Sequence, residues 1–246
     1  MSGIASEMYG DVLERPQTET TPFNPQSPYA CAKVYSHYIV KNYRDGYGLF
    51  ACNGILFNHE SPRRGANFVT MKIVNGVNES LRNNEFVLKL GNLNSMRDWG
   101  HSKDYVHGMW LMLQQDNPDD YVLATGTTIT VRAFVEMSFK HIGVEFEWQG
   151  SGVDEKGIDK ATGEVVVEID PSYFRPTEVE LLVGDASKAK KELGWVPKRT
   201  VEELCSEMVQ ADLDRFALGL FGTVSGFSFG SAVLLLPHSA HDGGGF

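Results

Sequence analysis

The sequence predicts an α/β fold in which a mostly parallel β-sheet is covered by helices on both faces. Short apolar runs alternate with segments of helical periodicity along most of the chain, which is typical of this class. Residues 49–57 are apolar almost throughout, the pattern of a strand buried on both of its faces. No internal repeat is evident, so a single α/β arrangement is expected rather than an array of units.

In the first half of the chain, apolar residues recur at strand or helix spacing between turn residues. Residues 1–7 have the pattern of a strand end, and helical spacing covers 29–43, where Gly46 and Gly48 are expected to stop the helix. Beyond the buried strand the same pattern predicts four further elements: a helix at 68–81, a strand at 86–90, a helix at 105–114 and a strand at 121–124.

In the second half, capping residues support the prediction of helices. Thr130 is a suitable N-cap for a helix at 131–141. Thr200 and Glu203 have the spacing of a capping box at the start of a helix that runs to about Arg215. The other expected segments are a charged, glycine-rich loop at 150–163, a strand at 165–169 and a short helix at 187–193.

Composition excludes several classes of function. The net charge of -10 argues against nucleic acid or an anionic membrane as partner. Cys31, Cys52 and Cys205 are scattered, which indicates neither a zinc site nor a disulfide framework and favours a reducing, cytoplasmic location. The uncharged, glycine-rich stretch within 216–246 predicts an atypical, disordered tail rather than a membrane anchor.

Tyr29 and Lys33 are the first candidates for chemistry. Four residues apart, they lie on one face of the predicted helix. A lysine ammonium beside a phenol favours the phenolate, so the tyrosine can act as a base closer to neutral pH. By itself this pair fits an ordinary amphipathic helix equally well.

Other motifs in the chain favour a functional role for this pair. The chain carries SEMYG at 6–10, NHESPRRG at 58–65, RDWGH at 97–101 and YFRPTE at 173–178. Together with the tyrosine and lysine, these runs resemble the GDP-mannose 4,6-dehydratases, which are extended short-chain dehydrogenase/reductase enzymes. The resemblance extends from about residue 6 to about residue 214.

The resemblance implies a fold and a reaction. The fold would be a partial Rossmann-like doubly wound parallel sheet with a smaller C-terminal α/β substrate domain. Residues 1–125 would belong mainly to the NADP-binding part, 126–215 mainly to the GDP-sugar part, and 216–246 to the tail. The reaction converts GDP-mannose to GDP-4-dehydro-6-deoxy-mannose, the first step toward GDP-fucose, with a bound NADP that is reduced and reoxidised in each turnover.

By the same resemblance, three residues carry the chemistry. Tyr29 takes the proton of the sugar 4-hydroxyl, and Lys33 lowers the pKa of Tyr29 and holds the nicotinamide ribose. Glu7 removes the C5 proton, which is acidified once C4 is oxidised, and helps to expel the C6 hydroxyl as water. The contacts implied for the ligands are His59 and Arg64 for NADP, and Asn58, Lys72, Arg97, Arg175 and Glu178 for the GDP-sugar.

The chain departs from the family pattern at three places. It contains no GxxGxxG loop of the kind that cradles cofactor phosphates, so the first half of the nucleotide-binding sheet is expected to be missing. Ala5 stands where the family has a Thr or Ser that hydrogen-bonds the reacting 4-oxygen. The uncharged tail does not resemble the family's ending.

Three interpretations follow from these departures. The chain is the C-terminal part of a dehydratase of an oligomeric family, inactive as a fragment, or it is a non-catalytic paralogue that associates with an intact dehydratase. The third is another sugar-nucleotide epimerase or reductase, but those enzymes have no need of a carboxylate at Glu7 to remove the C5 proton.

Overall fold

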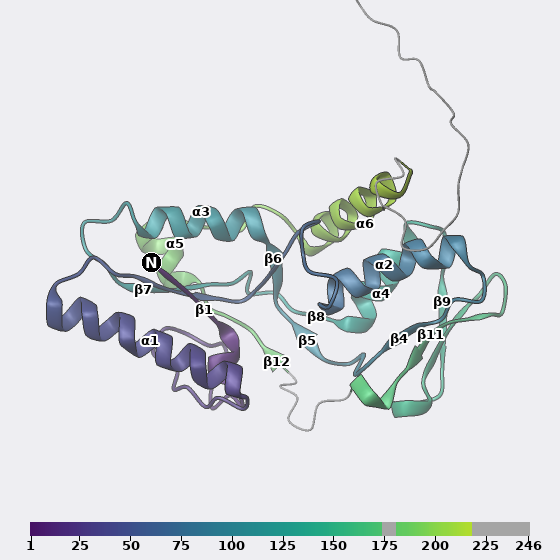
Figure 1. Cartoon of the computed structure of the whole chain (residues 1–246), viewed down its shortest axis with the longest axis horizontal. Coiled ribbons are helices and arrows are strands. Elements are labelled where there is room, and N and C mark those ends of the chain that lie inside the picture. Colours follow the sequence, from purple (N-terminus) through teal and green to yellow (C-terminus); the bar gives the residue numbers. More distant parts are fainter. Residues whose placement is uncertain (174–180, 218–246) are drawn as a thin grey trace, which may run out of the picture.

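The computed structural model describes residues 1–173 and 181–217 of the 246-residue chain. The molecule is elongated, with a parallel sheet and its covering helices at one end and a helical layer over a second sheet at the other (Figure 1). We refer to these two parts as the sheet lobe and the helical lobe. The α/β class predicted from the sequence is confirmed.

The sheet lobe is built on three parallel strands in the order β1 (Ser2–Ala5), β2 (Asn53–Leu56) and β7 (Asp120–Leu123). Pairing aligns Ile4 with Ile55 and Ile55 with Val122, so one row of aliphatic side chains crosses the sheet. All four residues of β2 are buried, as expected for the central strand of a covered parallel sheet.

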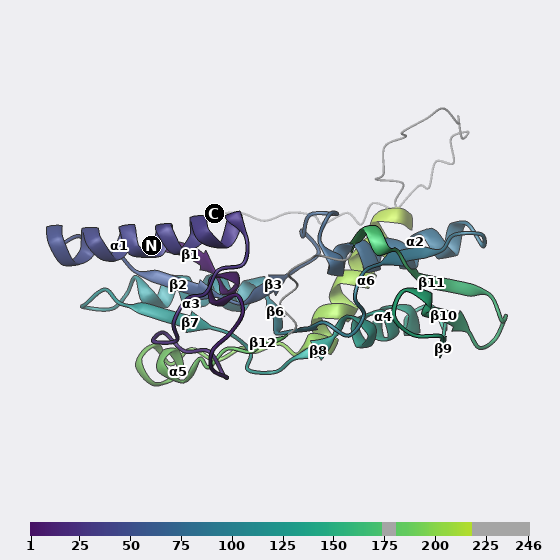
Figure 2. The ribbon, with the colours of Figure 1, turned by 90° about the horizontal axis from the view of Figure 1, so that it is seen from below.

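Helices cover both faces of this sheet. Helix α1 (Pro28–Tyr47) lies on one face and α3 (Ser102–Met112) on the other, with α5 (Ser187–Leu193) packed beside α3 and β7 (Figures 1 and 2). The loop between η1 (Ser6–Tyr9) and α1 is anchored by Tyr9, whose hydroxyl donates to the Thr18 carbonyl at 2.6 Å. This arrangement places the start of α1 at the carboxyl end of β1.

In the helical lobe, three helices pack together over a four-stranded sheet. The helices are α2 (Val69–Arg82), α4 (Val131–Lys140) and α6 (Val201–Ala217). The strands run in the order β4 (Leu88–Leu90), β11 (Val165–Ile169), β10 (Lys156–Asp159) and β9 (Phe146–Gln149). β4 and β11 are parallel and the other two pairs are antiparallel.

Short strands join the two lobes. β3 (Asn58–Glu60) pairs in parallel with β6 (Trp99–His101), and a separate small sheet has the order β12 (Leu181–Leu182), β5 (Met96–Arg97) and β8 (Ile129–Thr130). Two further 3₁₀ turns are η2 (Gly152–Asp154) and η3 (Pro171–Tyr173). Within the described residues, no helix combines the length and apolarity needed to cross a membrane.

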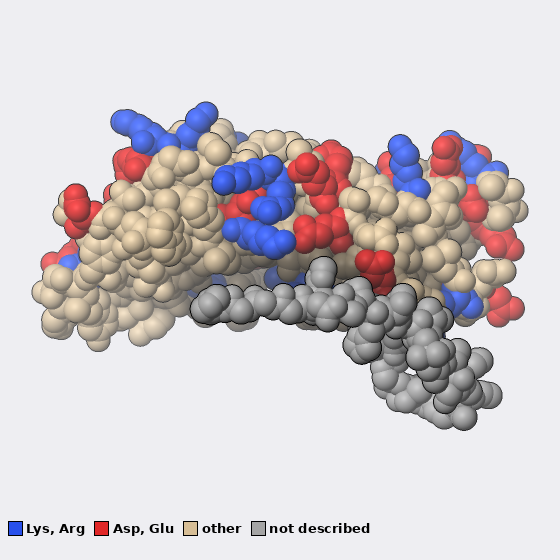
Figure 3. Space-filling view, turned by 90° about the horizontal axis from the view of Figure 1, so that it is seen from above, with Lys and Arg blue, Asp and Glu red and all other residues tan. Residues whose placement is uncertain are grey.

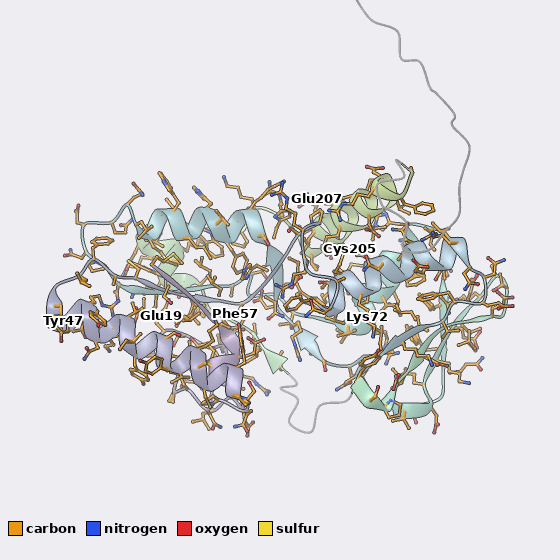
Figure 4. The ribbon with its side chains drawn as sticks, viewed as in Figure 1. Glu19, Tyr47, Phe57, Lys72, Cys205 and Glu207 are labelled. Carbon is orange, nitrogen blue, oxygen red and sulfur yellow. The ribbon has the colours of Figure 1, made fainter. Side chains whose placement is uncertain are left out.

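Polar contacts hold α6 against the sheet lobe. His101 Nε2 lies 2.8 Å from Glu207, whose other carboxylate oxygen accepts from Lys103 at 3.3 Å. Arg199 pairs with Asp104 at 2.8 Å. Figure 3 shows acidic and basic side chains intermixed near the middle of the α3 side of the molecule, and Figure 4 places Glu207 on α6 there.

The capping residues predicted from the sequence are confirmed. Thr130 accepts from the Ala133 amide at 3.1 Å. In the capping box, the Thr200 amide donates to Glu203 at 2.8 Å and the Glu203 amide donates to Thr200 Oγ1 at 3.2 Å.

One prediction about elements is wrong, and the start of one predicted helix is displaced. Residues 150–163 are not simply a loop, because β10 lies within them and is paired on both sides. The helix expected at 105–114 begins at Ser102, where the His101 ring accepts from the Lys103 amide and acts as its N-cap. Helix α6 runs through Ala217, and the rest of the predicted tail, 218–246, lies outside the described residues.

Candidate active site

The carboxyl ends of β1 and β2 bring the main candidates together. Glu7 follows β1 in η1, His59 follows β2 in β3, and Tyr29 stands in the first turn of α1. Adjacent parallel strands end at the same edge of a sheet, so residues more than fifty positions apart in the chain become neighbours there. Arg64 belongs to this group as well, because its charge acts on both Tyr29 and His59.

Gly10 makes the turn after Glu7 possible. Its φ is 54°, in the left-handed region, and a Cβ at this position would overlap the Asn24 carbonyl oxygen. The Asp11 amide donates to that same carbonyl at 3.3 Å, which ties the end of η1 to the loop before α1. Glu7 is therefore held half-buried beside the start of α1 rather than on a free loop.

Tyr29 is positioned by the start of α1. Ser27 caps the helix by accepting from the Ala30 amide at 3.1 Å, and Pro28 occupies the first helical position. The side chain of Tyr29 is 55% exposed. Lys33 Nζ lies 5.5 Å from the centre of the Tyr29 ring, so the predicted pair does share one face of the helix.

The lowered pKa expected for Tyr29 is wrong for this structure. Burial raises the pKa of Tyr29, the negative charge of Glu7 adds to the rise, and the positive charge of Arg64 opposes it. Lys33 instead donates to the Gly3 carbonyl at 3.4 Å, a contact that draws its ammonium toward β1. In this state Tyr29 is a protonated phenol that can donate a hydrogen bond.

His59 is held in one orientation by its neighbours. Its Nδ1 lies 2.9 Å from the Phe57 carbonyl and therefore donates, which leaves Nε2 as the acceptor. The ring stacks on Tyr105 at 5.0 Å between centroids. Burial lowers the pKa of His59, with the Phe57 carbonyl and Glu7 opposing and Arg64 reinforcing that effect, so the ring is neutral near pH 7.

Arg64 is held by a buried acid. Its Nε lies 2.9 Å from Glu60, which also accepts from Thr70 Oγ1 at 2.7 Å, and its guanidinium lies 3.4 Å from the centre of the Phe68 ring. Burial raises the pKa of Glu60, while Arg64 and Thr70 oppose the rise. The pair keeps a cation at the edge of the cluster, where an anionic ligand group would be attracted.

The residues predicted to contact the GDP-sugar are spread more widely. Asn58 and Arg97 lie at the junction of the lobes, on β3 and β5, and Arg97 Nη1 donates to the Met96 carbonyl at 2.9 Å. Lys72 lies on α2 with its ammonium 3.4 Å from the centre of the Tyr173 ring (Figure 4). Arg175 and Glu178 lie outside the described residues.

Three residues that shape this region received no role from the sequence. Glu60 and Tyr105 support Arg64 and His59 as described above, and buried Asp98 accepts from the amides of Thr125 and Gly126, each at 2.9 Å. Glu60 and Asp98 lie inside two of the motifs that carry the family resemblance, which was the available signal. Tyr105 lies in a run that also resembles the family, 103–106, but its stacking on His59 is a tertiary contact that no spacing could show.

Solved structures show the class of fold. The chain superposes on a dTDP-glucose 4,6-dehydratase of Bacillus anthracis, solved in complex with NAD, with a TM-score of 0.72 and 22% identity over 87% of this chain and 61% of that one. A UDP-N-acetylglucosamine 4-epimerase of Methanobrevibacter ruminantium gives a TM-score of 0.68 at 20% identity, covering 87% of this chain and 62% of that one. The fold is thus the one that sugar-nucleotide dehydratases and epimerases share.

Sequence comparison is more specific. The family model described as GDP-mannose 4,6 dehydratase matches residues 4–208. A GDP-mannose 4,6 dehydratase of Drosophila melanogaster is 60% identical over 85% of this chain, and a GDP-mannose 4,6-dehydratase of Vibrio cholerae is 58% identical over the same share. The chain belongs to the GDP-mannose 4,6-dehydratase family. It spans only 53% and 59% of the lengths of these two relatives.

Proposed function

We propose that this chain supplies the proton-transfer and sugar-binding residues of a GDP-mannose 4,6-dehydratase, a hydro-lyase that acts on GDP-mannose in GDP-fucose biosynthesis. The observation that carries the proposal is the placement of Glu7 beside Tyr29 at the carboxyl end of β1, inside the segment that the family model matches. Because the chain spans little more than half of its relatives, the activity is proposed for an assembly that also contains the remaining part.

The chemistry assigned to Glu7 follows from its type and place. Once C4 of the sugar is a ketone, the C5 proton is acidic enough for a carboxylate to remove it. Half-buried and fixed by the turn at Gly10, Glu7 can take that proton and return it to the departing C6 hydroxyl, which leaves as water. Tyr29 lies near Glu7 at the start of α1, so its hydroxyl, once deprotonated, would accept the proton that the 4-hydroxyl of the same sugar ring loses when C4 is oxidised.

The residues present suit the nicotinamide end of a dinucleotide. Tyr29 and Lys33 present a hydroxyl and an ammonium on an exposed helix start, and a neutral His59 and a cationic Arg64 lie nearby. A bound nicotinamide cofactor supplies the oxidation at C4 and the reduction at C6. We propose NADP as that cofactor on the strength of the family to which the chain belongs.

The remaining assignments complete the proposal. Asn58, Lys72 and Arg97, with Arg175 and Glu178, would hold GDP-mannose, and the arginines suit its pyrophosphate. The division at about residue 125 would separate mainly cofactor-binding from mainly sugar-binding segments. A cytoplasmic homo-oligomer is the expected form of the assembled enzyme.

A second candidate function rests on Ala5. The family's Thr or Ser at this place supplies a hydroxyl to the reacting oxygen, and an alanine methyl cannot do so. Ser6 does not replace that hydroxyl, because it begins the 3₁₀ turn with its side chain fully buried. A chain with this substitution could serve as a non-catalytic subunit that binds an intact dehydratase.

The test is to restore the missing part and measure turnover. The segment of the Drosophila relative that precedes its matched region would be fused ahead of this chain, and formation of GDP-4-dehydro-6-deoxy-mannose from GDP-mannose measured with NADP present. We expect slow turnover that Ala5→Thr raises by about 10²-fold and that Glu7→Gln abolishes. The matched control, Ser6→Thr, should not raise the rate.

Absence of product from the fusion that carries Ala5→Thr, while its far-UV circular dichroism and GDP-mannose binding are normal, would overturn the catalytic proposal. Product formed by the Ala5→Thr fusion but not by the fusion with Ala5 would favour the non-catalytic subunit.

A further inference from the structure

Gln17 is a polar residue that the folded chain buries completely. Its Oε1 accepts from the Val183 amide at 2.9 Å, and its Nε2 donates to the Glu14 carbonyl at 2.9 Å. Its own amide donates to the Val183 carbonyl at 2.9 Å, and its carbonyl accepts from the Asp185 amide at 2.8 Å. These bonds hold Gln17 in a parallel β-bridge with Gly184.

The loop that carries Gln17 joins the two residues to which proton transfer is assigned. It begins after η1, which contains Glu7, and it ends where α1 begins, next to Tyr29. Within the same loop, Glu19 accepts from the Val122 amide of β7 at 2.7 Å (Figure 4). The loop is therefore attached to the rest of the sheet lobe between Glu7 and Tyr29.

The segment that Gln17 contacts continues directly from a strand beside Arg97. β12 pairs in parallel with β5, and the register places Leu182 opposite Arg97. Val183, to which Gln17 is bonded, is the next residue in the chain. The attachment of the loop is thus one residue away from the strand partner of Arg97, a proposed contact of the GDP-sugar.

Asp98 contacts the same segment from the opposite side. Successive amides of an extended segment point to opposite sides, and the Gly184 amide bonds to the buried carboxylate of Asp98. A Cβ at Gly184 would lie 2.4 Å from the Cβ of Ala124 and 2.6 Å from the Phe57 ring. Residues 183–185 are therefore fixed between Gln17, Asp98 and the ends of β2 and β7.

We propose that Gln17 is a positioning residue for the dehydration, because its bonds to residues 183–185 set the distance from Glu7 and Tyr29 to a sugar nucleotide bound at Arg97. Gln17 acts through these neighbours. Proton transfer requires heavy atoms about 2.6–3.2 Å apart, and a displacement of about 1 Å can cost about 10²-fold in rate. The inference rests on the proposed function.

The first test measures turnover by the fusion with Ala5→Thr described above, well below its thermal midpoint. Gln17→Leu leaves the Val183 amide without its side-chain acceptor. We expect kcat to fall by about tenfold or more, while KM for GDP-mannose changes by less than about threefold, because the groups that bind the sugar nucleotide remain.

Gln210→Leu is the matched control. Gln210 is an exposed glutamine on α6 whose Nε2 donates to Asp214 at 2.8 Å, so the same change of residue type occurs far from Gln17 in the fold. This variant should keep both kcat and KM.

Gln17→Glu distinguishes positioning from a general loss of structure. A protonated carboxylic acid can accept from the Val183 amide and donate to the Glu14 carbonyl, whereas a carboxylate cannot donate. The kcat of this variant, divided by that of the unaltered fusion at each pH, should approach one at acid pH and fall as the pH rises. A ratio that does not depend on pH would contradict the role of these two bonds.

Hydrogen–deuterium exchange of the 246-residue chain adds a measurement that requires no activity. Gln17→Leu should speed exchange in 181–185 and in η1 and leave α4 unchanged. Unchanged exchange in 181–185 and η1 would overturn the inference, as would a folded Gln17→Leu fusion with normal kcat or with a change in KM alone. If the unaltered fusion forms no product, the proposed function fails, and the exchange data still decide whether Gln17 fixes the two segments.

Discussion

The two lobes bury their helices to very different extents. In the helical lobe, the 14-residue α2 has seven buried residues and the 10-residue α4 has five. In the sheet lobe, the 20-residue α1 has only Ala30 and His37 buried. Length is therefore not what distinguishes the lobes; the difference is that α2 and α4 each pack against two other helices, whereas α1 packs against η1, β1 and β2.

The difference has a physical consequence. Most of the stability of a helix in a protein comes from burying its apolar face, at about 1.5–3 kcal/mol for each large side chain fully removed from water. The helices of the helical lobe bury their apolar faces against one another, in a core that includes Trp99, Phe134 and Phe139. The sheet lobe leaves its tyrosines on α1 and Trp110 on α3 in solvent, so these side chains contribute little to its stability.

The largest effect on stability is expected from Phe134→Ala in the helical lobe. Phe134 is fully buried and its ring lies 5.2 Å from that of Trp99, so the truncation should lower the free energy of unfolding by about 3–5 kcal/mol. Trp110→Ala removes a larger ring and should change it by less than about 0.5 kcal/mol. Urea denaturation of both variants measures the contrast, and similar costs would contradict it.

A smaller but substantial loss is expected from Asp120→Asn, which breaks the main polar contact between α1 and the sheet. Arg44 Nη1 lies 2.7 Å from Asp120, and Asn53 donates to the same carboxylate at 3.0 Å. Leaving Arg44 half-buried without its partner should cost about 2–4 kcal/mol in thermal or urea unfolding. A cost below about 1 kcal/mol would show that α1 is held mainly by apolar contacts.

Asp120 also makes the stability of the chain depend on pH in the acid range. Burial favours a higher pKa for Asp120, but the hydrogen bond and charge of Arg44, aided by His37 and Asn53, outweigh it and hold that pKa below its ordinary value of 3.8. The stabilisation is therefore complete above pH 3.8 and is lost as the pH falls toward the lower pKa of the folded state. Asp120→Asn should remove this part of the pH dependence, and an unchanged acid profile would contradict the assignment.

The smallest effect is expected from Tyr47→Ser at the end of α1. Because Tyr47 is 72% exposed, its replacement should change the free energy of unfolding of the chain by no more than about 0.5 kcal/mol. A loss above about 1.5 kcal/mol, measured by urea denaturation, would mean that Tyr47 already packs against other parts of this chain.

The same contrast explains which parts of the fold could be predicted from the sequence. Helices with local signals were found, such as α4 with Thr130 and α6 with its capping box. β10 was missed because its sequence, Lys156 to Asp159, has little strand character and is held by its pairing with β9 and β11. Strands of two or three residues such as β5 and β8 have no local pattern at all.

The candidate site shows the same division. Glu7, Tyr29 and His59 were found through motifs, and the structure places them within electrostatic reach of one another. The pKa of Tyr29 could not be predicted, because it depends on burial and on the position of Lys33, whose ammonium donates to a backbone carbonyl of β1. The spacing of two residues in a sequence predicts that they share one face of a helix, but it does not predict which groups that face contacts in the folded protein.

Hydrogen–deuterium exchange of the 246-residue chain tests the central claim most directly, because it reports the local opening of each element. We predict strong protection in peptides from α2, α4 and α6, and faster exchange in peptides from β1 and α1. Equal protection of α1 and α4 would contradict the claim that the helices of the helical lobe are packed more completely than α1 of the sheet lobe.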